Sequence, residues 1–221
     1  MVDTWRVIRR AGSTRTRIAG LALAVSMLVG ACASTGYTYI KNGADNAYFR
    51  VPDDWKVYDE DAIVELIAEG SSEQAEEAFR DVVWQVGFDA HPRPSIKHVF
   101  RPRTSPAGSA TVQQLTRQQS DSASIFGLRN FMVDIDTLSE EGTGAILNEE
   151  RIELEGGFFG VHLVGVFVRG SANRELTFNQ VSLLDQGATK VYSLFVFCES
   201  QCYEEHEKDI KRVIDSLTVE E

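Results

Sequence analysis

Two cysteines near the end of the chain have the spacing with the most definite chemistry. Cys198 and Cys202 lie in the segment Cys-Glu-Ser-Gln-Cys, between a predicted strand and a predicted helix. In an exported protein an even pair of cysteines usually forms a disulfide, and so short a loop would fasten the start of the following helix. The alternative is a metal site, because His206 continues the spacing and Glu199 or Glu205 could supply a fourth ligand. We predict the disulfide, and therefore no metal at this position.

The four histidines of the chain have no catalytic partner that spacing assigns to them, whether serine, cysteine or carboxylate. They are His91, His98, His162 and His206. His162 alternates with Val164, Val166 and Val168, so we expect a partly covered residue of a sheet rather than a general base. We therefore predict that the protein is not an enzyme and has no catalytic residue and no cofactor.

An acidic segment at 134–144 offers a second possible cation site. Asp134 and Asp136 could chelate a divalent cation, because two carboxylates on one side of a strand would converge. A solvated acidic loop is the preferred interpretation, and Gly142-Thr143-Gly144 lacks the third glycine of a dinucleotide-binding turn. No metal or nucleotide site is predicted here.

The first 31 residues have the composition of a cleavable export signal. Five arginines precede an uncharged apolar stretch of 14 residues, Ile18 to Ala31, whereas a transmembrane helix needs about 20. The stretch ends in Val29-Gly30-Ala31-Cys32, which resembles the lipobox of bacterial lipoproteins. This resemblance implies that the Cys32 thiol is diacylated, with palmitate as an expected acyl chain, and that the chain is cut before it. The alternatives are an ordinary secretory signal or an uncleaved signal anchor, and the export route, Sec or Tat, stays open.

Removal of this leader leaves a strongly acidic protein. The leader carries five arginines and Asp3, so the remaining 190 residues have 17 basic and 32 acidic residues and a net charge of −15. Such a charge argues against nucleic acid as a partner and against a domain that lies flat on anionic lipid. The length is that of one domain with a sizeable core.

The remaining sequence predicts strands and helices in an α+β order. Residues 32–45 are small and polar and are interpreted as a lipidated tether, followed by a strand over 47–51 and a Pro52-to-Trp55 turn. Helical spacing follows over 62–67 and 75–82, then a strand over 83–89. Residues 91–109 hold Pro92, Pro94, Pro102 and Pro106 with Arg93, Lys97, Arg101 and Arg103, which indicates an irregular basic loop. Further elements are expected at 110–116 (strand), 120–131 (helix), 145–154, 158–169, 175–184 and 191–198 (strands), and 203–217 (helix).

The short turns between the last four strands indicate an antiparallel meander, whose apolar face the amphipathic helices would cover. The arrangement resembles the PsbP/Mog1-like fold, also found in actinobacterial lipoproteins. The likeness rests on the opening strand and turn from Tyr48 to Trp55, the hairpins from Ala145 to Cys198, and the closing Val213-Ile214-Asp215-Ser216-Leu217. It implies an α/β/α sandwich and an accessory or binding role. The expected division is a signal peptide at 1–31, a tether at 32–45 and a PsbP/Mog1-like domain at 46–221.

These observations predict a lipid-anchored module on the extracytoplasmic face of the cell membrane. Its expected partners are the membrane, through the lipid on Cys32, and a protein or complex of the cell envelope. The alternative function is capture of a small molecule, such as a lipid, a sugar or a metal ion. A cavity bordered by Arg93, Arg101 and Arg103 would favour an anionic ligand.

Overall fold

The computed structural model describes residues 36–67, 72–101, 104–170 and 173–220. The predicted signal peptide and Cys32 lie outside these residues. No helix within the described ranges is both long enough and apolar enough to cross a membrane.

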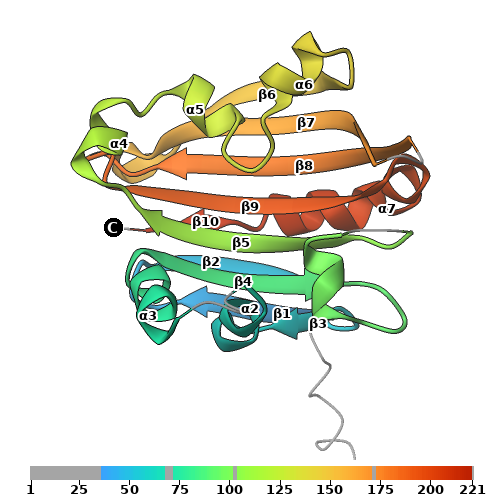
Figure 1. Ribbon diagram of the computed structural model, residues 1–221, viewed down its shortest axis with the longest axis horizontal. Helices are drawn as coiled ribbons and strands as arrows, with labels where there is room; N and C mark the ends of the chain where they lie inside the picture. The colour runs from blue at the N-terminus through green and yellow to red at the C-terminus, as the bar shows by residue number, and fades with distance from the viewer. Residues whose placement is uncertain (1–35, 68–71, 102–103, 171–172, 221) are drawn as a thin grey trace, which may run out of the picture. The chain divides into compact units, whose positions relative to one another are not determined.

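A seven-stranded antiparallel sheet forms the centre of the domain (Figure 1). The predicted meander is confirmed, since its four strands are hydrogen-bonded in the order of the chain. Across the sheet the order is β3 (Lys56–Tyr58), β4 (Val83–Asp89), β5 (Ala107–Gln114), β9 (Lys190–Glu199), β8 (Arg174–Leu184), β7 (Phe159–Arg169) and β6 (Gly144–Glu153).

The two faces of this sheet are covered by different elements. Along β9, Tyr192, Leu194 and Val196 point into one buried cluster, which they share with α7 (Ser200–Ile214). The small sheet of β1 (Tyr37–Asn42), β2 (Ala47–Pro52) and β10 (Thr218–Val219) adds to the same cluster, and we call this side the α7 face. Phe195 and Phe197 point to the opposite face, against α6 (Ile135–Glu140). The expected α+β class, an antiparallel sheet between two covering layers, is confirmed.

The opposite face carries the short helices. These are α2 (Glu60–Ile67), α3 (Glu73–Val82), the single turn η1 (Ile96–Val99), α4 (Arg117–Asp121), α5 (Ile125–Arg129) and α6. Figure 1 shows α2 and α3 over one end of the strand order and α4, α5 and α6 over the other. A helix was expected over 120–131, but the chain forms α4 and α5 there, each begun by its own cap, Thr116 and Ser124.

The predicted tether at 32–45 is wrong over most of its length. Residues 37–42 form β1, which pairs with β2 along its whole length, and Ile40 and Asn42 are buried. The Asn42 side-chain oxygen accepts from the backbone N–H groups of Ala44 and Asp45 and closes the β1–β2 turn. The compact unit therefore begins at Gly36 and not at residue 46.

Gly160 in β7 tests how closely the strands of the sheet are packed. A Cβ atom there would collide with the backbone carbonyl oxygen of Ser182 and would lie 2.8 Å from the Cα of Leu183. We expect Gly160→Ala to lower the free energy of unfolding by about 1–3 kcal/mol, measured by urea denaturation.

Gly127 in α5 provides the matched control. Its added Cβ would meet nothing closer than the Ser124 hydroxyl at 3.7 Å, so Gly127→Ala should be neutral or should stabilise by up to about 1 kcal/mol. Equal effects of the two substitutions would contradict the close packing described for β7 and β8.

Candidate functional site: a groove beside the C-terminal helix

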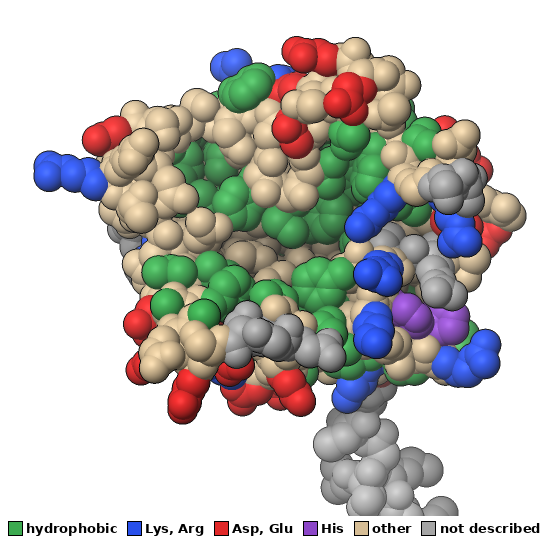
Figure 2. Space-filling view, in the orientation of Figure 1, with side chains coloured by type: hydrophobic (Ala, Val, Ile, Leu, Met, Phe, Trp, Pro, Cys, Tyr) green, Lys and Arg blue, Asp and Glu red, His purple; other side chains and the backbone are tan. Residues whose placement is uncertain are grey.

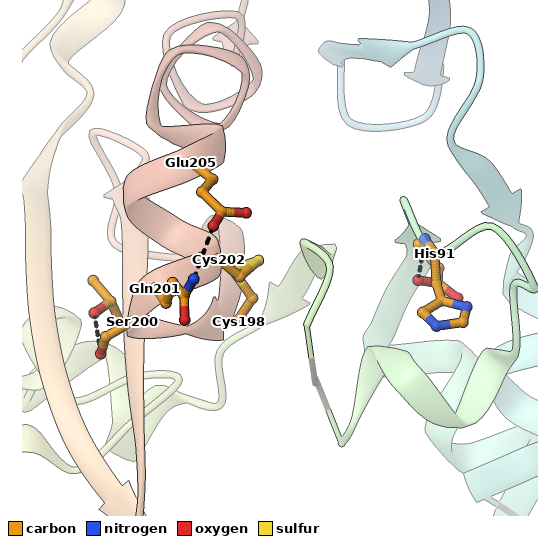
Figure 3. Close-up of a disulfide and its surroundings, with 8 residues drawn as sticks. His91, Cys198, Ser200, Gln201, Cys202 and Glu205 are labelled. Atoms are coloured by element: carbon orange, nitrogen blue, oxygen red, sulfur yellow. Dashed lines mark hydrogen bonds between the residues drawn. A yellow bond between two sulfur atoms is a disulfide. The ribbon is translucent and has the colours of Figure 1, made fainter.

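The predicted disulfide joins the end of β9 to the first turn of α7. Cys198 and Cys202 are bonded to each other and buried in the cluster of the α7 face (Figure 3). Because each sulfur is bonded to the other, neither is a thiolate ligand, and the alternative metal site with His206 is wrong. The disulfide prediction is confirmed.

The disulfide lies at the N-terminus of α7, which has no side-chain capping hydrogen bond. Glu199 is the N-cap residue of α7 and makes no capping hydrogen bond through its side chain. One further contact fastens the first turn, since the Thr177 hydroxyl on β8 donates to the Ser200 hydroxyl at 2.8 Å. Farther along, Ile210, Val213 and Ile214 are buried and hold the helix against the sheet. Helix α7 therefore has a fixed position over β8 and β9.

The sheet extends beyond the helix, and this leaves a groove. On β7, Val164 and Val166 are only partly covered on the α7 face. A β-bulge between Ile146 and Asn148 leaves Leu147 without a partner in the register, and Leu147 lines the groove with 60% of its surface exposed. The resulting groove between α7 and the β6–β7 hairpin has a volume of about 760 Å³.

A chain of hydrogen bonds forms part of the floor of this groove. His162 Nε2 lies 2.7 Å from Asn179 Oδ1, and Asn179 Nδ2 donates to the Tyr203 hydroxyl at 3.0 Å. Burial raises the pKa of the Tyr203 phenol; the hydrogen bond from Asn179 opposes this rise and the charge of Glu207 adds to it. Tyr203 is therefore a neutral phenol at physiological pH.

The rim of the groove is acidic. Four exposed carboxylates line it, against one lysine, Lys211, that is itself paired with Asp215 at 2.9 Å. The carboxylates belong to Glu150, Glu175, Glu204 and Glu207. Exposed surface carboxylates attract cations over roughly 8–10 Å in physiological salt. An apolar wall and an acidic rim together favour a ligand that is both apolar and cationic.

The other predicted residues lie elsewhere or have structural contacts. The Asp134 side chain accepts from Thr137 N and begins α6, so the expected loop at 134–144 contains a helix. Asp136 accepts from Arg129 Nη2 at 2.7 Å and from Asn130. The two carboxylates therefore serve different partners, and no cluster of three or more potential metal ligands occurs in the described parts of the chain.

Sequence reasoning found the disulfide and the half-covered His162, but it missed the groove. The polarity of Asn148 and Glu150 was visible within the strand predicted over 145–154. What was not visible is the bulge at Leu147, which turns an apolar side chain toward the same side as Asn148. Within 145–150, three apolar residues are followed by three polar ones, which breaks the strict alternation of a regular strand. This break is the signal that could have indicated the bulge.

Comparisons with known proteins give fold matches only. No protein-family model and no curated protein sequence matches the chain. Among solved structures, PsbP from the cyanobacterium Synechocystis matches with a TM-score of 0.49 and 15% identity, over 87% of this chain and 99% of that one. LpqN, described as involved in cell envelope biogenesis of Mycobacterium tuberculosis, matches with a TM-score of 0.48 and 16% identity, over 84% and 91%. The Ran-binding protein Mog1p of Saccharomyces cerevisiae matches with a TM-score of 0.44 and 9% identity, over 83% of this chain and 95% of that one.

PsbP and Mog1p, after which the expected PsbP/Mog1-like fold is named, are both among these matches. At TM-scores below 0.5 and identities of 16% or less, they carry no argument about what this chain binds.

The disulfide should contribute modestly to stability because the loop that it closes is short. We expect dithiothreitol to lower the free energy of unfolding by about 1–2 kcal/mol in urea denaturation. The Cys198→Ala/Cys202→Ala variant should unfold at the same urea concentration with and without reductant. An unchanged midpoint for the unsubstituted chain under reduction, or free thiols at both positions in the oxidised protein, would contradict the assignment.

Proposed function

We propose that this protein is a lipid-anchored, non-catalytic binding module of the cell envelope, and that it holds a cationic amphipathic segment of a partner protein in the α7 groove. The observation that carries the proposal is the apolar groove of about 760 Å³ with an acidic rim. The disulfide supports an oxidising compartment, because such bonds form and persist outside the cytoplasm.

The proposed anchor places the domain close to the bilayer. Only Ala33, Ser34 and Thr35 separate Cys32 from Gly36, where the compact unit begins. Even fully extended, this segment spans at most about 15 Å. Any partner must therefore reach the domain within a short distance of the membrane. The net charge of −15 for residues 32–221 favours a cationic protein surface over bare anionic lipid.

The proposed partner segment follows from the groove chemistry. Apolar side chains of the segment would contact Leu147, Val164 and Val166, and its lysines or arginines would face Glu204 and Glu207. This is the mode in which an amphipathic helix or strand occupies a groove on a preformed domain. The four histidines offer no nucleophile–base pair in the described contacts, and the proposal assigns no catalytic step to the domain.

Substitution of Cys32 tests the anchor. We expect Cys32→Ser to move the protein from the membrane fraction to the medium or the soluble envelope fraction, because the residue then lacks a thiol to acylate. Cell fractionation with immunoblotting measures the distribution. Membrane retention equal to that of the unsubstituted protein would contradict lipidation at Cys32.

A photoreactive amino acid placed at Leu147 tests the groove. Leu147 is 60% exposed, so the substitution should be tolerated, and irradiation of intact cells should give a defined heterologous adduct. The adduct should lose most of its intensity in the Glu204→Lys/Glu207→Lys background, because the rim charge is reversed.

The matched control is the same photoreactive residue at Phe126, which is 62% exposed on α5 of the opposite face. It should not give that adduct. Adducts of equal intensity at both positions, or recovery of only uncross-linked monomer with the photoreactive residue at position 147, would contradict the proposed groove interaction.

A further inference from the structure

A group of cations on the opposite face has no acidic partner among the described residues. Six lysines and arginines elsewhere in the described residues form ion pairs with carboxylates, and six others, scattered over the domain, do not. Arg93, Lys97 and Arg101 are exposed and form no ion pair with any described residue, although acidic residues far outnumber basic ones after residue 31. Arg169 joins them, since its Nη1 donates to the Phe100 carbonyl at 3.3 Å. Figure 2 shows lysine and arginine side chains gathered beside histidines on one side of this face.

The loop that carries these cations is held in place by a buried carboxylate. Asp89, at the end of β4, is 1% exposed and accepts from the backbone N–H groups of His91 at 2.9 Å and Ser95 at 2.8 Å. Its Oδ2 also lies 2.7 Å from His98 Nδ1. These contacts hold the Asp89 carboxylate on the inner side of the loop. The exposed charged side chains of the loop are therefore basic. The segment predicted as an irregular loop is thus locally ordered around Asp89 and η1.

A pocket lies directly beside two of these cations. Leu66 and Ile67 from α2 and Phe100 after η1 form its apolar wall, and Lys97 and Arg101 stand on the same wall. Its volume is about 360 Å³, within the range of small-molecule sites. Ile67 is 43% exposed, so the pocket leaves apolar surface open next to positive charge. Arg103, which was expected at such a cavity, lies outside the described residues.

We propose that this pocket binds an anionic amphiphile. Its aliphatic chain would lie against Leu66, Ile67 and Phe100, while Lys97 and Arg101 would bind its carboxylate or phosphate. Only a ligand with both an apolar and an anionic part satisfies the whole pocket. A small inorganic anion would leave the apolar wall exposed to water, and a neutral hydrocarbon would leave both cations without an anionic partner. This site lies on the other face from the α7 groove and is independent of the proposed protein partner.

Neighbouring strands connect the start of the compact unit to the basic loop. Tyr37 pairs with Pro52 at the start of β1, and after the next turn Lys56 pairs with Asp89, the residue that orders the basic loop. With Cys32 acylated, which rests on the proposed function, the start of the compact unit would lie close to the bilayer. The anionic group could therefore belong to a free amphiphile or to a lipid within the membrane, and the two sources share the same chemistry.

Calorimetric titration of the full Cys32→Ser chain with decanoate and with decan-1-ol, below their aggregation limits, tests the site. Decanoate should bind at least about tenfold more tightly than decan-1-ol, a difference of about 1.4 kcal/mol. The Lys97→Gln/Arg101→Gln variant should lose this preference. The control Arg117→Gln/Lys208→Gln removes one arginine and one lysine, both exposed and outside the pocket lining, and should keep it.

Sedimentation with vesicles distinguishes the two sources. Vesicles that contain phosphatidylglycerol should bind more of the control variant than of Lys97→Gln/Arg101→Gln if the anion is a membrane lipid, and phosphatidylcholine vesicles should not discriminate between them. Dependence on Lys97 and Arg101 in either the decanoate or the vesicle measurement supports the site. Equal binding of the two variants in both measurements, with circular dichroism showing both folded, would overturn it, whatever the outcome at Cys32 or Leu147.

Discussion

The two-sided burial of β8 and β9 is the constraint on which the rest of the domain depends. Alternate side chains of these strands fill separate clusters on the two faces, so each face requires its own cover. Helix α7 covers one face of this central pair, and α5 contacts β8 from the other face, where α6 packs beside it on β6 and β7. On its own face, helix α7 leaves Val164 and Val166 of β7 only partly covered, and the α7 groove lies there.

The α7 groove and the pocket beside Phe100 differ in charge because the carboxylates near the groove are exposed and the one near the pocket is buried. Beside α7, the glutamates of β6, β8 and the helix point outward around Val164 and Val166, so the apolar surface has an acidic rim. On the opposite face, Asp89 is buried and is occupied by backbone N–H groups and His98, so Lys97 and Arg101 set the charge of the pocket beside Phe100. A strongly acidic domain can in this way present one acidic and one basic surface. We propose that a cationic protein segment and an anionic amphiphile occupy them, on different sides of the sheet.

The sequence predicted the parts of the fold that depend on local pattern. The four strands predicted between 145 and 198 are present as β6 to β9, each ten or eleven residues long. The Cys198–Cys202 disulfide followed from spacing and compartment. The start of the domain did not follow, because β1 buries only Ile40 and Asn42 and owes its existence to pairing with β2. Helix α6 is six residues long and depends on the Asp134 cap and on Ile135 packing against Phe178, which a periodicity test of a short acidic segment cannot reveal.

The two proposed binding surfaces could not be predicted from the sequence for a related reason. The α7 groove needs a bulge at Leu147 together with the position of a helix that follows more than fifty residues later, and neither is a local property. The chain of contacts from His162 through Asn179 to Tyr203 joins three separate elements. The order of the basic loop depends on Asp89, whose partners His91, Ser95 and His98 belong to a segment that shows only prolines and positive charge in the sequence.

The central claim is that the uncovered sheet surface beside α7 is a binding site for a cationic amphipathic segment. Hydrogen exchange of the full chain, followed by mass spectrometry, tests it most directly with a synthetic amphipathic peptide that has leucines on one face and lysines on the other. We expect slower exchange in β6, β7 and the first turns of α7, unchanged exchange at residues 96–101, and no effect of a matched peptide with glutamates in place of lysines. Equal effects of the two peptides, or protection confined to other parts of the domain, would contradict it.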